Sequence, residues 1–353
     1  MTLYREIEKS KKIYPAEQAL KNFRDLREIA TDLPEVRIYS TSDGKWLYCS
    51  NGGKAIPYVT ATSDYQQIEG YAAELTKEEI GGTAMRFLFR TAFECQFCYR
   101  KIISLHAACI ELNDFAVAFT GPSGIGKSTR ALAWMNALGA ELISGDRPAV
   151  RIENTGSMAC GVPWDGKEQI FRDVEKPLRC ILEVRRSSSN YLRRLSREQA
   201  RKLIVQQSFV PMWDTDAAMA MANVSALINK TPMYRVFCGP DEDSARMVYD
   251  ILINHPELIR EEAKDMKIKK GFVLRNVMDE YIVMPTGDNI AKFDGSVVLN
   301  EVSAFIYKLL ENPMCRDDLL AAVLNEYDVD ESTASTDLDA LLNKLDKMGV
   351  LEK

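Results

Sequence analysis

Residues Gly121 to Ser128, "GPSGIGKS", have the residue types and spacing of a phosphate-binding loop. Glycines let the backbone turn its N–H groups toward phosphate oxygens, and the following helix adds partial positive charge at its N-terminus. In such a loop the Lys127 ammonium lies near the β- and γ-phosphates, and the Ser128 hydroxyl can bind magnesium. We therefore expect a nucleotide to be bound by Gly121, Ser123, Gly124, Ile125, Gly126, Lys127, Ser128 and Thr129.

The flanks of this loop have the expected composition. The run "FAVAFT" before it is typical of a buried strand. After it, apolar residues recur on one helical face, and Gly139 stands where a helix-capping glycine belongs. Strand, loop and helix thus follow in the required order. They do not select a reaction, because kinases, motor ATPases, GTPases and transporters share this loop.

Two more side chains are candidates for the same site. His106, one of two histidines, precedes Gly121 by fifteen residues, and Asp146 closes the strand-like run "AELISGD". Ends of neighbouring strands in a parallel α/β sheet face one crevice. We expect His106, Lys127, Ser128 and Asp146 to surround one nucleotide, with donors suited to a metal. The other histidine, in "INHPELI", precedes a proline and is typical of a turn.

The stretch from Leu105 to Asp146 resembles the catalytic core of the HPr serine kinase/phosphorylase family and, more distantly, ATP-dependent phosphoenolpyruvate carboxykinase. The resemblance continues weakly through "VPWDGKEQIFRDVEKPLRCILEV" and "LSREQARKLIVQQSF". It implies a P-loop α/β kinase core that uses ATP and Mg²⁺. It also implies catalytic roles for Asp146, Lys127 and His106, and a metal site formed by Ser128, Asp146 and His106.

The chain departs from that family at one position. The family carries two adjacent aspartates at this strand end, and Gly145 replaces the first, which would be the base. Three explanations remain open. Asp146 serves both as the base and as the metal ligand, another carboxylate such as Asp165 or Glu168 replaces the missing base, or base catalysis is dispensable. A general base contributes about 10²- to 10⁴-fold, whereas phosphoryl transfer depends more on positioning and charge. The helical signature for docking HPr is missing, so we do not expect HPr as the substrate.

Three other stretches have more than one interpretation. The stretch "PWDGKE" has two interpretations. Its lysine contacts the phosphates and Trp164 lines the nucleotide pocket, or it is a surface turn anchored by the tryptophan. Cys95 and Cys98 have no second CxxC, which favours buried apolar cysteines over a zinc or redox site. The basic stretch from Glu183 to Lys202 is interpreted as a helix with a solvated basic face.

The chain divides into three zones. Residues 1–105 are β-rich, with strand-like "EVRIYST" and "KWLYCSN" followed by a helix over about 82–98. Residues 106–262 hold the loop and alternate strands with helices. Residues 267–353 begin with short strands and end in helices. The predicted fold class is α/β, with a P-loop core, an N-terminal β-rich part and a small C-terminal α+β winged-helix-like domain.

The last zone has three helix-like apolar stripes, with Pro313 between the first and second. The strand pattern of "KGFVLRNVMDEYIVMPTG", followed by "VVLNEVSAFIYKLLE", resembles the PqqD family over residues 267–353. That family recognises leader segments of ribosomally made precursor peptides by adding the peptide as a strand. The resemblance implies a peptide site at the edge from Ile290 to Val298 and along the last helix, from Asp337 to Leu345. A domain that merely packs on the core is the alternative; the last helix is not basic, which disfavours DNA.

The amino-acid composition argues against some classes of binding partner. The 353 residues carry a net charge of −6, which argues against a broad nucleic-acid interface. No apolar run approaches the roughly 18 to 20 residues of a membrane span, and the first residues lack a signal-peptide core. We therefore expect a cytoplasmic protein with no nucleic-acid or membrane partner, and leave homo-oligomerisation open.

Together these features predict a kinase that phosphorylates a Ser/Thr hydroxyl of a peptide or protein recruited by the C-terminal domain. A non-catalytic ATP-binding recognition protein is the first alternative, favoured by Gly145. A small-metabolite kinase is the second.

Overall fold

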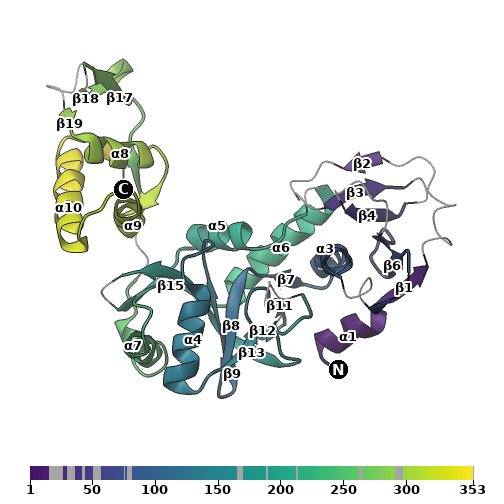
Figure 1. Ribbon diagram of the computed structural model, residues 1–353. Helices are drawn as coiled ribbons and strands as arrows, with labels where there is room; N and C mark the ends of the chain where they lie inside the picture. The colour runs from purple at the N-terminus through teal and green to yellow at the C-terminus, as the bar shows by residue number, and fades with distance from the viewer. Residues whose placement is uncertain are drawn as a thin grey trace.

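The computed structural model describes residues 1–15, 27–29, 36–41, 44–50, 57–74, 76–77, 82–164, 170–187, 190–211, 214–261, 265–278, 280–290 and 297–352. The sheet that carries the phosphate-binding loop lies in the middle of the molecule (Figure 1). An N-terminal sheet lies on one side of it, and the C-terminal helices lie on the other. The predicted α/β class is confirmed.

The central sheet has nine strands in the described part of the chain. Its order is β10-β8-β9-β13-β12-β11-β7, and β15 pairs with both β13 and β14. Strands β9, β13 and β15 are parallel, so their carboxyl ends meet at one edge. The bounds are β7 (Ile102–Ser104), β8 (Ala107–Leu112), β9 (Phe115–Thr120), β10 (Glu141–Ser144), β11 (Ala149–Ile152), β12 (Ser157–Cys160), β13 (Glu175–Arg186), β14 (Tyr191–Arg194) and β15 (Met233–Cys238).

Helices cover both faces of this sheet. Alternate residues of β9 and β13 pack with α5 (Arg197–Gln207) and α6 (Asp214–Lys230) in one hydrophobic cluster. The intervening residues pack with α4 (Lys127–Leu138) and α7 (Glu242–Ile253) in another. Continuous apolar burial on both faces is the pattern of a parallel sheet between helix layers. The predicted loop helix is confirmed, and Gly139 caps it with φ 71°.

The N-terminal sheet has the order β1-β6-β5-β4-β3-β2. Helix α3 (Thr83–Tyr99), predicted over about 82–98, packs against it and shares a core with residues of β11 and β12. The other elements are α1 (Leu3–Ser10), β1 (Lys12–Pro15), β2 (Arg27–Ile29), β3 (Val36–Ser40), β4 (Trp46–Ser50), β5 (Tyr58–Ala61) and β6 (Ile68–Ala72). Strands β3 and β4 confirm the two strand-like segments of the sequence.

Residues 265–352 share a separate hydrophobic cluster and are called the C-terminal unit below. The three apolar stripes become α8 (Glu301–Leu309), α9 (Arg316–Glu326) and α10 (Glu331–Lys347). One sheet contains β17 (Phe272–Val277), β18 (Glu280–Pro285) and β19 (Val297–Leu299). A second contains β16 (Asp265–Ile268), β20 (Met314–Cys315) and β21 (Leu351–Glu352).

One secondary-structure prediction was wrong. The basic stretch from Glu183 to Lys202 is not a single helix: it holds the end of β13, all of β14 and the start of α5. Val184 and Leu192 are fully buried among β-sheet neighbours, so the charged residues beside them alternate with core positions at a strand period. No described helix is long and apolar enough to cross a lipid bilayer.

Candidate functional site

The phosphate-binding loop connects β9 to α4 and needs glycine at several positions. Gly124 has φ 77° and Gly126 has φ 101°, a region that residues with a Cβ rarely adopt. A Cβ on Gly126 would also lie 2.3 Å from a guanidinium nitrogen of Arg130. That buried guanidinium donates to the carbonyl oxygens of Ile125 (3.3 Å) and Cys238 (2.9 Å). Arg130 therefore holds the end of the loop against β15.

Lys127 begins α4 and folds back over the loop. Its ammonium donates to the carbonyl oxygens of Gly121 (3.0 Å) and Pro122 (3.3 Å). The residue is only 8% exposed, and in the described part of the chain no carboxylate lies within ion-pair distance of it. Burial lowers the pKa of Lys127, while the charge of Asp146 acts in the opposite direction. A buried ammonium with no carboxylate in direct contact, at a helix N-terminus, fits an anionic ligand.

His106 and Asp146 come together at the same sheet edge. The imidazole Nε2 lies 3.2 Å from Asp146 Oδ1. Two backbone contacts fix the segments: the Ala107 N–H donates to the Asp146 carbonyl (2.8 Å), and the Thr120 hydroxyl donates to the His106 carbonyl (2.8 Å). Since Thr120 immediately precedes Gly121, both side chains lie beside the loop.

The electrostatics of Asp146 link it to the loop lysine. Its pKa is lowered first by the hydrogen bond to His106, and also by the charges of Arg147 and Lys127. Burial acts in the opposite direction. The carboxylate is therefore ionised at neutral pH, and His106, Lys127 and Asp146 form one interacting group.

Arg147 is a neighbour that the sequence interpretation missed. Its guanidinium lies 3.9 Å from Asp146 Oδ2 and 3.7 Å from Glu94 Oε1 on α3. Glu94 is 3% exposed and accepts a hydrogen bond from Ser104 (2.7 Å). Arg147 thus joins the site to a buried carboxylate behind it. The only sequence signal was its position next to Asp146.

The remaining predicted residues have simpler surroundings. Ser123, Gly124, Ser128 and Thr129 are exposed at the loop and the first turn of α4. Among the described residues the Ser128 hydroxyl makes no hydrogen bond, and no group of three histidine, cysteine or acidic residues is close enough to hold a metal. Ser128 and Asp146 nevertheless offer the oxygen donors that Mg²⁺ prefers. Asp165 and Glu168 lie outside the described residues.

The structure bears on two of the open interpretations; of "PWDGKE", only Pro163 and Trp164 lie in the described part of the chain. Trp164 is 6% exposed and stacks on Phe93 of α3, with ring centroids 5.4 Å apart. It anchors the N-terminal core and does not line the loop. Cys95 and Cys98 are buried, unpaired thiols on α3, as expected for apolar cysteines.

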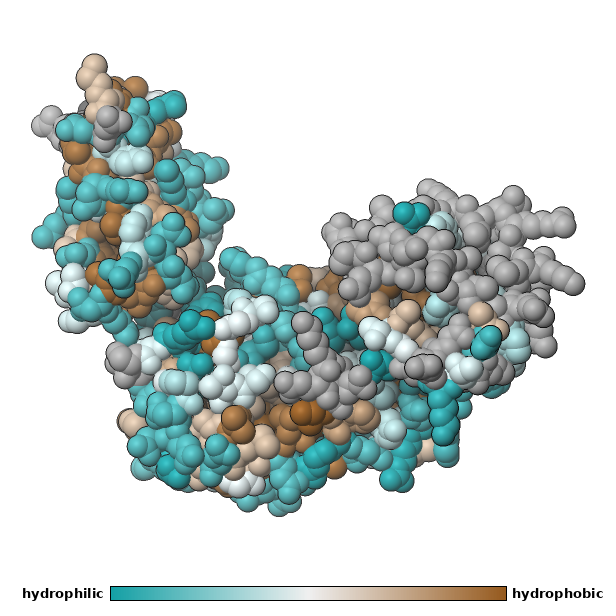
Figure 2. Space-filling view, viewed as in Figure 1, coloured by the Kyte–Doolittle hydropathy of each residue, from teal (hydrophilic) through white to brown (hydrophobic). Residues whose placement is uncertain are grey.

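A groove of about 460 Å³ crosses the C-terminal unit. It lies between β19, α8 and α10, and Asp337, Ala340 and Lys344 on α10 are exposed along it. Strand β19 pairs with β18, and no other described strand pairs with its second edge. Apolar surface is visible on this part of the molecule between hydrophilic patches (Figure 2). Of the edge predicted from Ile290 to Val298, residues 291–296 lie outside the described part; the predicted segment of α10 lines the groove.

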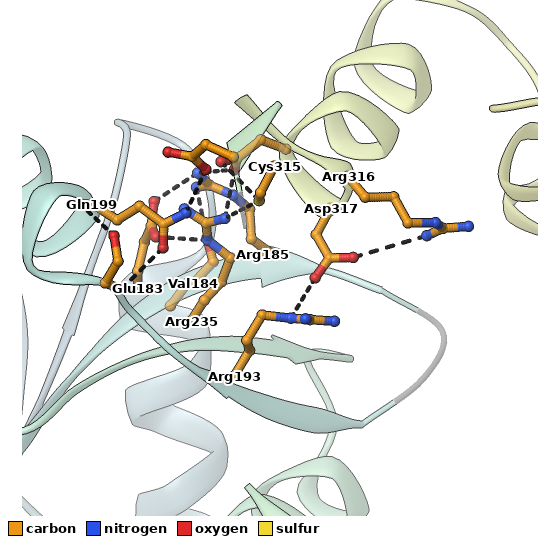
Figure 3. A network of polar contacts seen from close by, with 12 residues as sticks. Glu183, Val184, Arg185, Arg193, Gln199, Arg235, Cys315, Arg316 and Asp317 are labelled. Atoms are coloured by element: carbon orange, nitrogen blue, oxygen red, sulfur yellow. Dashed lines mark hydrogen bonds and ion pairs between the residues drawn. The ribbon is translucent and has the colours of Figure 1, made fainter. Parts of the chain in front are cut away.

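The C-terminal unit contacts the central sheet through a network of charges, called the domain joint below (Figure 3). Arg235 of β15 pairs with Glu183 of β13 (2.8 Å) and with Asp318 of α9 (2.7 Å). Arg193 of β14 pairs with Asp317 of α9 (2.7 Å). Arg235 and Glu183 are each 5% exposed. The joint therefore covers the α5/α6 face of the sheet near its carboxyl edge.

Residues 280–351 match the family model described as "Coenzyme PQQ synthesis protein D (PqqD)". This segment is a PqqD-like domain. It contains β18, β19 and α8 to α10, and therefore includes the groove and the α9 side of the joint. No curated protein matches the chain.

Two solved structures are similar to parts of this chain. One is described as "TbiB1 in Complex with the TbiA(beta) Leader Peptide": 27% identical, TM-score 0.21, covering 24% of this chain and 94% of the other. The other is the Hpr(Ser) kinase/phosphatase from Coxiella burnetii: 13% identical, TM-score 0.27, covering 44% of this chain and 90% of the other.

Proposed function

We propose that this protein is an ATP-dependent kinase that phosphorylates a Ser/Thr hydroxyl of a peptide or protein held by its PqqD-like domain. The observation that carries the proposal is the meeting of Lys127, Asp146 and His106 at the edge where β9 enters the loop. The family resemblance of residues Leu105 to Asp146 supports a kinase over the other reactions that use such a loop.

The side chains have distinct tasks in this proposal. Backbone N–H groups of the loop and the Lys127 ammonium bind and orient the phosphates, which is where much of the catalysis of phosphoryl transfer arises. Magnesium, when bound with ATP, supplies further charge neutralisation, and Ser128 and Asp146 are the residues that would hold it. His106 keeps the Asp146 carboxylate in place through the 3.2 Å contact.

We assign removal of the proton from the acceptor hydroxyl to Asp146. Gly145 has no side chain, so Asp146 is the carboxylate at this strand end. Its lowered pKa keeps it ionised but makes it a weak base. The proposal therefore assigns Asp146 mainly to orientation and charge, with proton removal a smaller part of the rate.

The PqqD-like domain is proposed to capture a ribosomally made precursor peptide. An extended segment would add to the free edge of β19, and apolar side chains would enter the groove toward α8 and α10. Since the joint attaches this domain near the carboxyl edge of the P-loop sheet, a second part of the same peptide is available to the loop.

The test is transfer of radioactive phosphate from [γ-³²P]ATP to peptides encoded by short reading frames beside this gene. We expect one of them to be labelled on Ser or Thr, and Lys127→Ala to abolish labelling. Binding of such a peptide and of ATP without any labelling would reject the kinase proposal.

Gly145 favours a second candidate, a recognition protein that binds ATP without turning it over. In that case nucleotide binding only sets the position of the PqqD-like domain. The same assay separates the two: peptide and ATP bind in both, but ³²P appears on the peptide, or phosphate is released, only in the first.

A further inference from the structure

The end of β13 presents two consecutive arginines in opposite directions. Successive side chains on a strand point to opposite faces of the sheet. Arg185 turns toward the domain joint, where its guanidinium lies 2.6 Å from Glu183 Oε1 and 3.5 Å from Asp318 Oδ1. Arg186 turns toward the phosphate-binding loop and donates to the Gly124 carbonyl oxygen at 2.8 Å. Two adjacent residues of β13 therefore make different contacts: Arg185 contacts the PqqD-like domain, and Arg186 contacts the phosphate-binding loop.

The joint links the end of β13 to α9. Asp318 is shared by Arg185 and Arg235, and Glu183 pairs with both arginines from within β13. Burial makes these pairs costly to break one at a time, because a charge is then left uncompensated. A movement of α9 therefore acts on β13 through Asp318.

Arg186 has few other constraints. Its side chain is exposed, and among the described residues it makes no ion pair. Its guanidinium donates to Gly124, a residue in the left-handed region with open space where a Cβ would stand. The contact orients the most permissive part of the loop.

We propose that Arg186 positions the phosphate-binding loop, and that docking of the PqqD-like domain, through Asp318 and Arg185, sets this contact. Affinity for ATP then depends on the state of the domain joint. By linkage, ATP bound at the loop acts back on the joint with the same free energy. The inference rests on the nucleotide binding of the proposed function and does not require phosphoryl transfer.

The first experiment measures the Kd for ATP by calorimetry on the full chain. Arg186→Ala is expected to raise Kd about fivefold, the size of one lost hydrogen bond from a charged donor at an exposed site. Arg186→Gln keeps an N–H donor and is expected to return Kd to within about twofold of wild type. Arg246→Ala, an exposed arginine on α7, is the control and leaves Kd unchanged. A normal Kd for Arg186→Ala, or no recovery in Arg186→Gln, would overturn the positioning role.

The second experiment is a double-mutant cycle between Asp318→Asn and Arg186→Ala. Asp318→Asn alone is expected to weaken ATP binding about threefold, and to have no further effect once Arg186 is absent. Equal effects in both backgrounds, or none in either, would overturn the link to the joint. Arg185→Gln interrupts the link from the β13 side if thermal unfolding shows Asp318→Asn to be misfolded.

These results are separable from the kinase proposal. Wild-type protein that does not bind ATP would reject the proposed function itself. Wild-type protein that binds ATP normally, with an Arg186→Ala Kd equal to its own, would reject only the inference.

Discussion

The imidazole of His106 lies 3.2 Å from the carboxylate of Asp146, although forty positions separate them in the chain. The contact joins the start of β8 to the end of β10, because the Ala107 N–H also donates to the Asp146 carbonyl. It therefore has a measurable consequence for stability.

Asp146→Ala is expected to reduce stability in a pH-dependent way. The folded pKa of Asp146 is lower than its ordinary value of 3.8, so ionisation favours the folded state. This contribution is complete above the unfolded pKa and is lost as pH falls through the lower folded pKa. The difference in free energy of unfolding between wild type and variant should shrink below about pH 4. Thermal or denaturant unfolding at several pH values gives the readout, and a pH-independent difference for Asp146→Ala would contradict the assignment.

Gly126→Ala tests the backbone of the loop. A Cβ at φ 101° is strained and meets the Arg130 guanidinium, so we expect destabilisation of about 1–3 kcal/mol and loss of measurable ATP binding. Gly156→Ala is the matched control, since nothing lies within 4 Å of its Cβ position. Denaturant titration and calorimetry give the two readouts. Normal ATP affinity in Gly126→Ala would argue against nucleotide binding by this loop.

Glu183→Gln tests the energetics of the domain joint. Removing this buried charge leaves Arg235 with only Asp318, and we expect a loss of about 3 kcal/mol in the free energy of unfolding. Glu242→Gln removes a comparable pair on the exposed surface of α7 and should cost less than about 0.5 kcal/mol. Similar losses in the two variants would show that the joint behaves as a surface contact.

Ala340→Trp tests the groove. The residue is exposed and lines the groove from α10, so an indole there fills part of the 460 Å³ without disturbing the core. We expect KM for the labelled peptide to rise at least tenfold while Kd for ATP stays the same, if the peptide occupies this groove. Asn343→Trp, exposed on α10 but outside the groove lining, is the control. Unchanged KM would place peptide capture elsewhere.

Much of the P-loop core could be predicted from the sequence, because the patterns that specify it lie within short segments of the chain. The glycine spacing around Lys127 and the apolar period of the next residues specify the strand–loop–helix unit, and both appear where expected. The approach of His106 to Asp146 was expected from parallel strands, but β8 runs antiparallel to β9 and β10, so it is the start of β8 that lies at the same edge as their carboxyl ends.

Other features depended on contacts that the sequence does not carry. Arg185 and Arg186 lie in the basic stretch from Glu183 to Lys202. Its many charged residues were interpreted as the solvated face of a helix, and only the pairing of β13 with its neighbours shows that both arginines are in a strand. The acidic pair Asp317–Asp318 stands at the start of α9, and its partners across the joint are more than eighty residues earlier in the chain. The role of Trp164 was left open because its aromatic partners come from α3.

The domain joint has a consequence for engineering. A chimera that exchanges the recognition module for one with a different peptide preference must retain acidic residues at the positions of Asp317 and Asp318. Without them the guanidinium of Arg235 would remain in a nearly solvent-free position with one carboxylate where it now has two. Grafts chosen only for their peptide specificity would then express as unstable proteins, whereas grafts carrying both aspartates would fold.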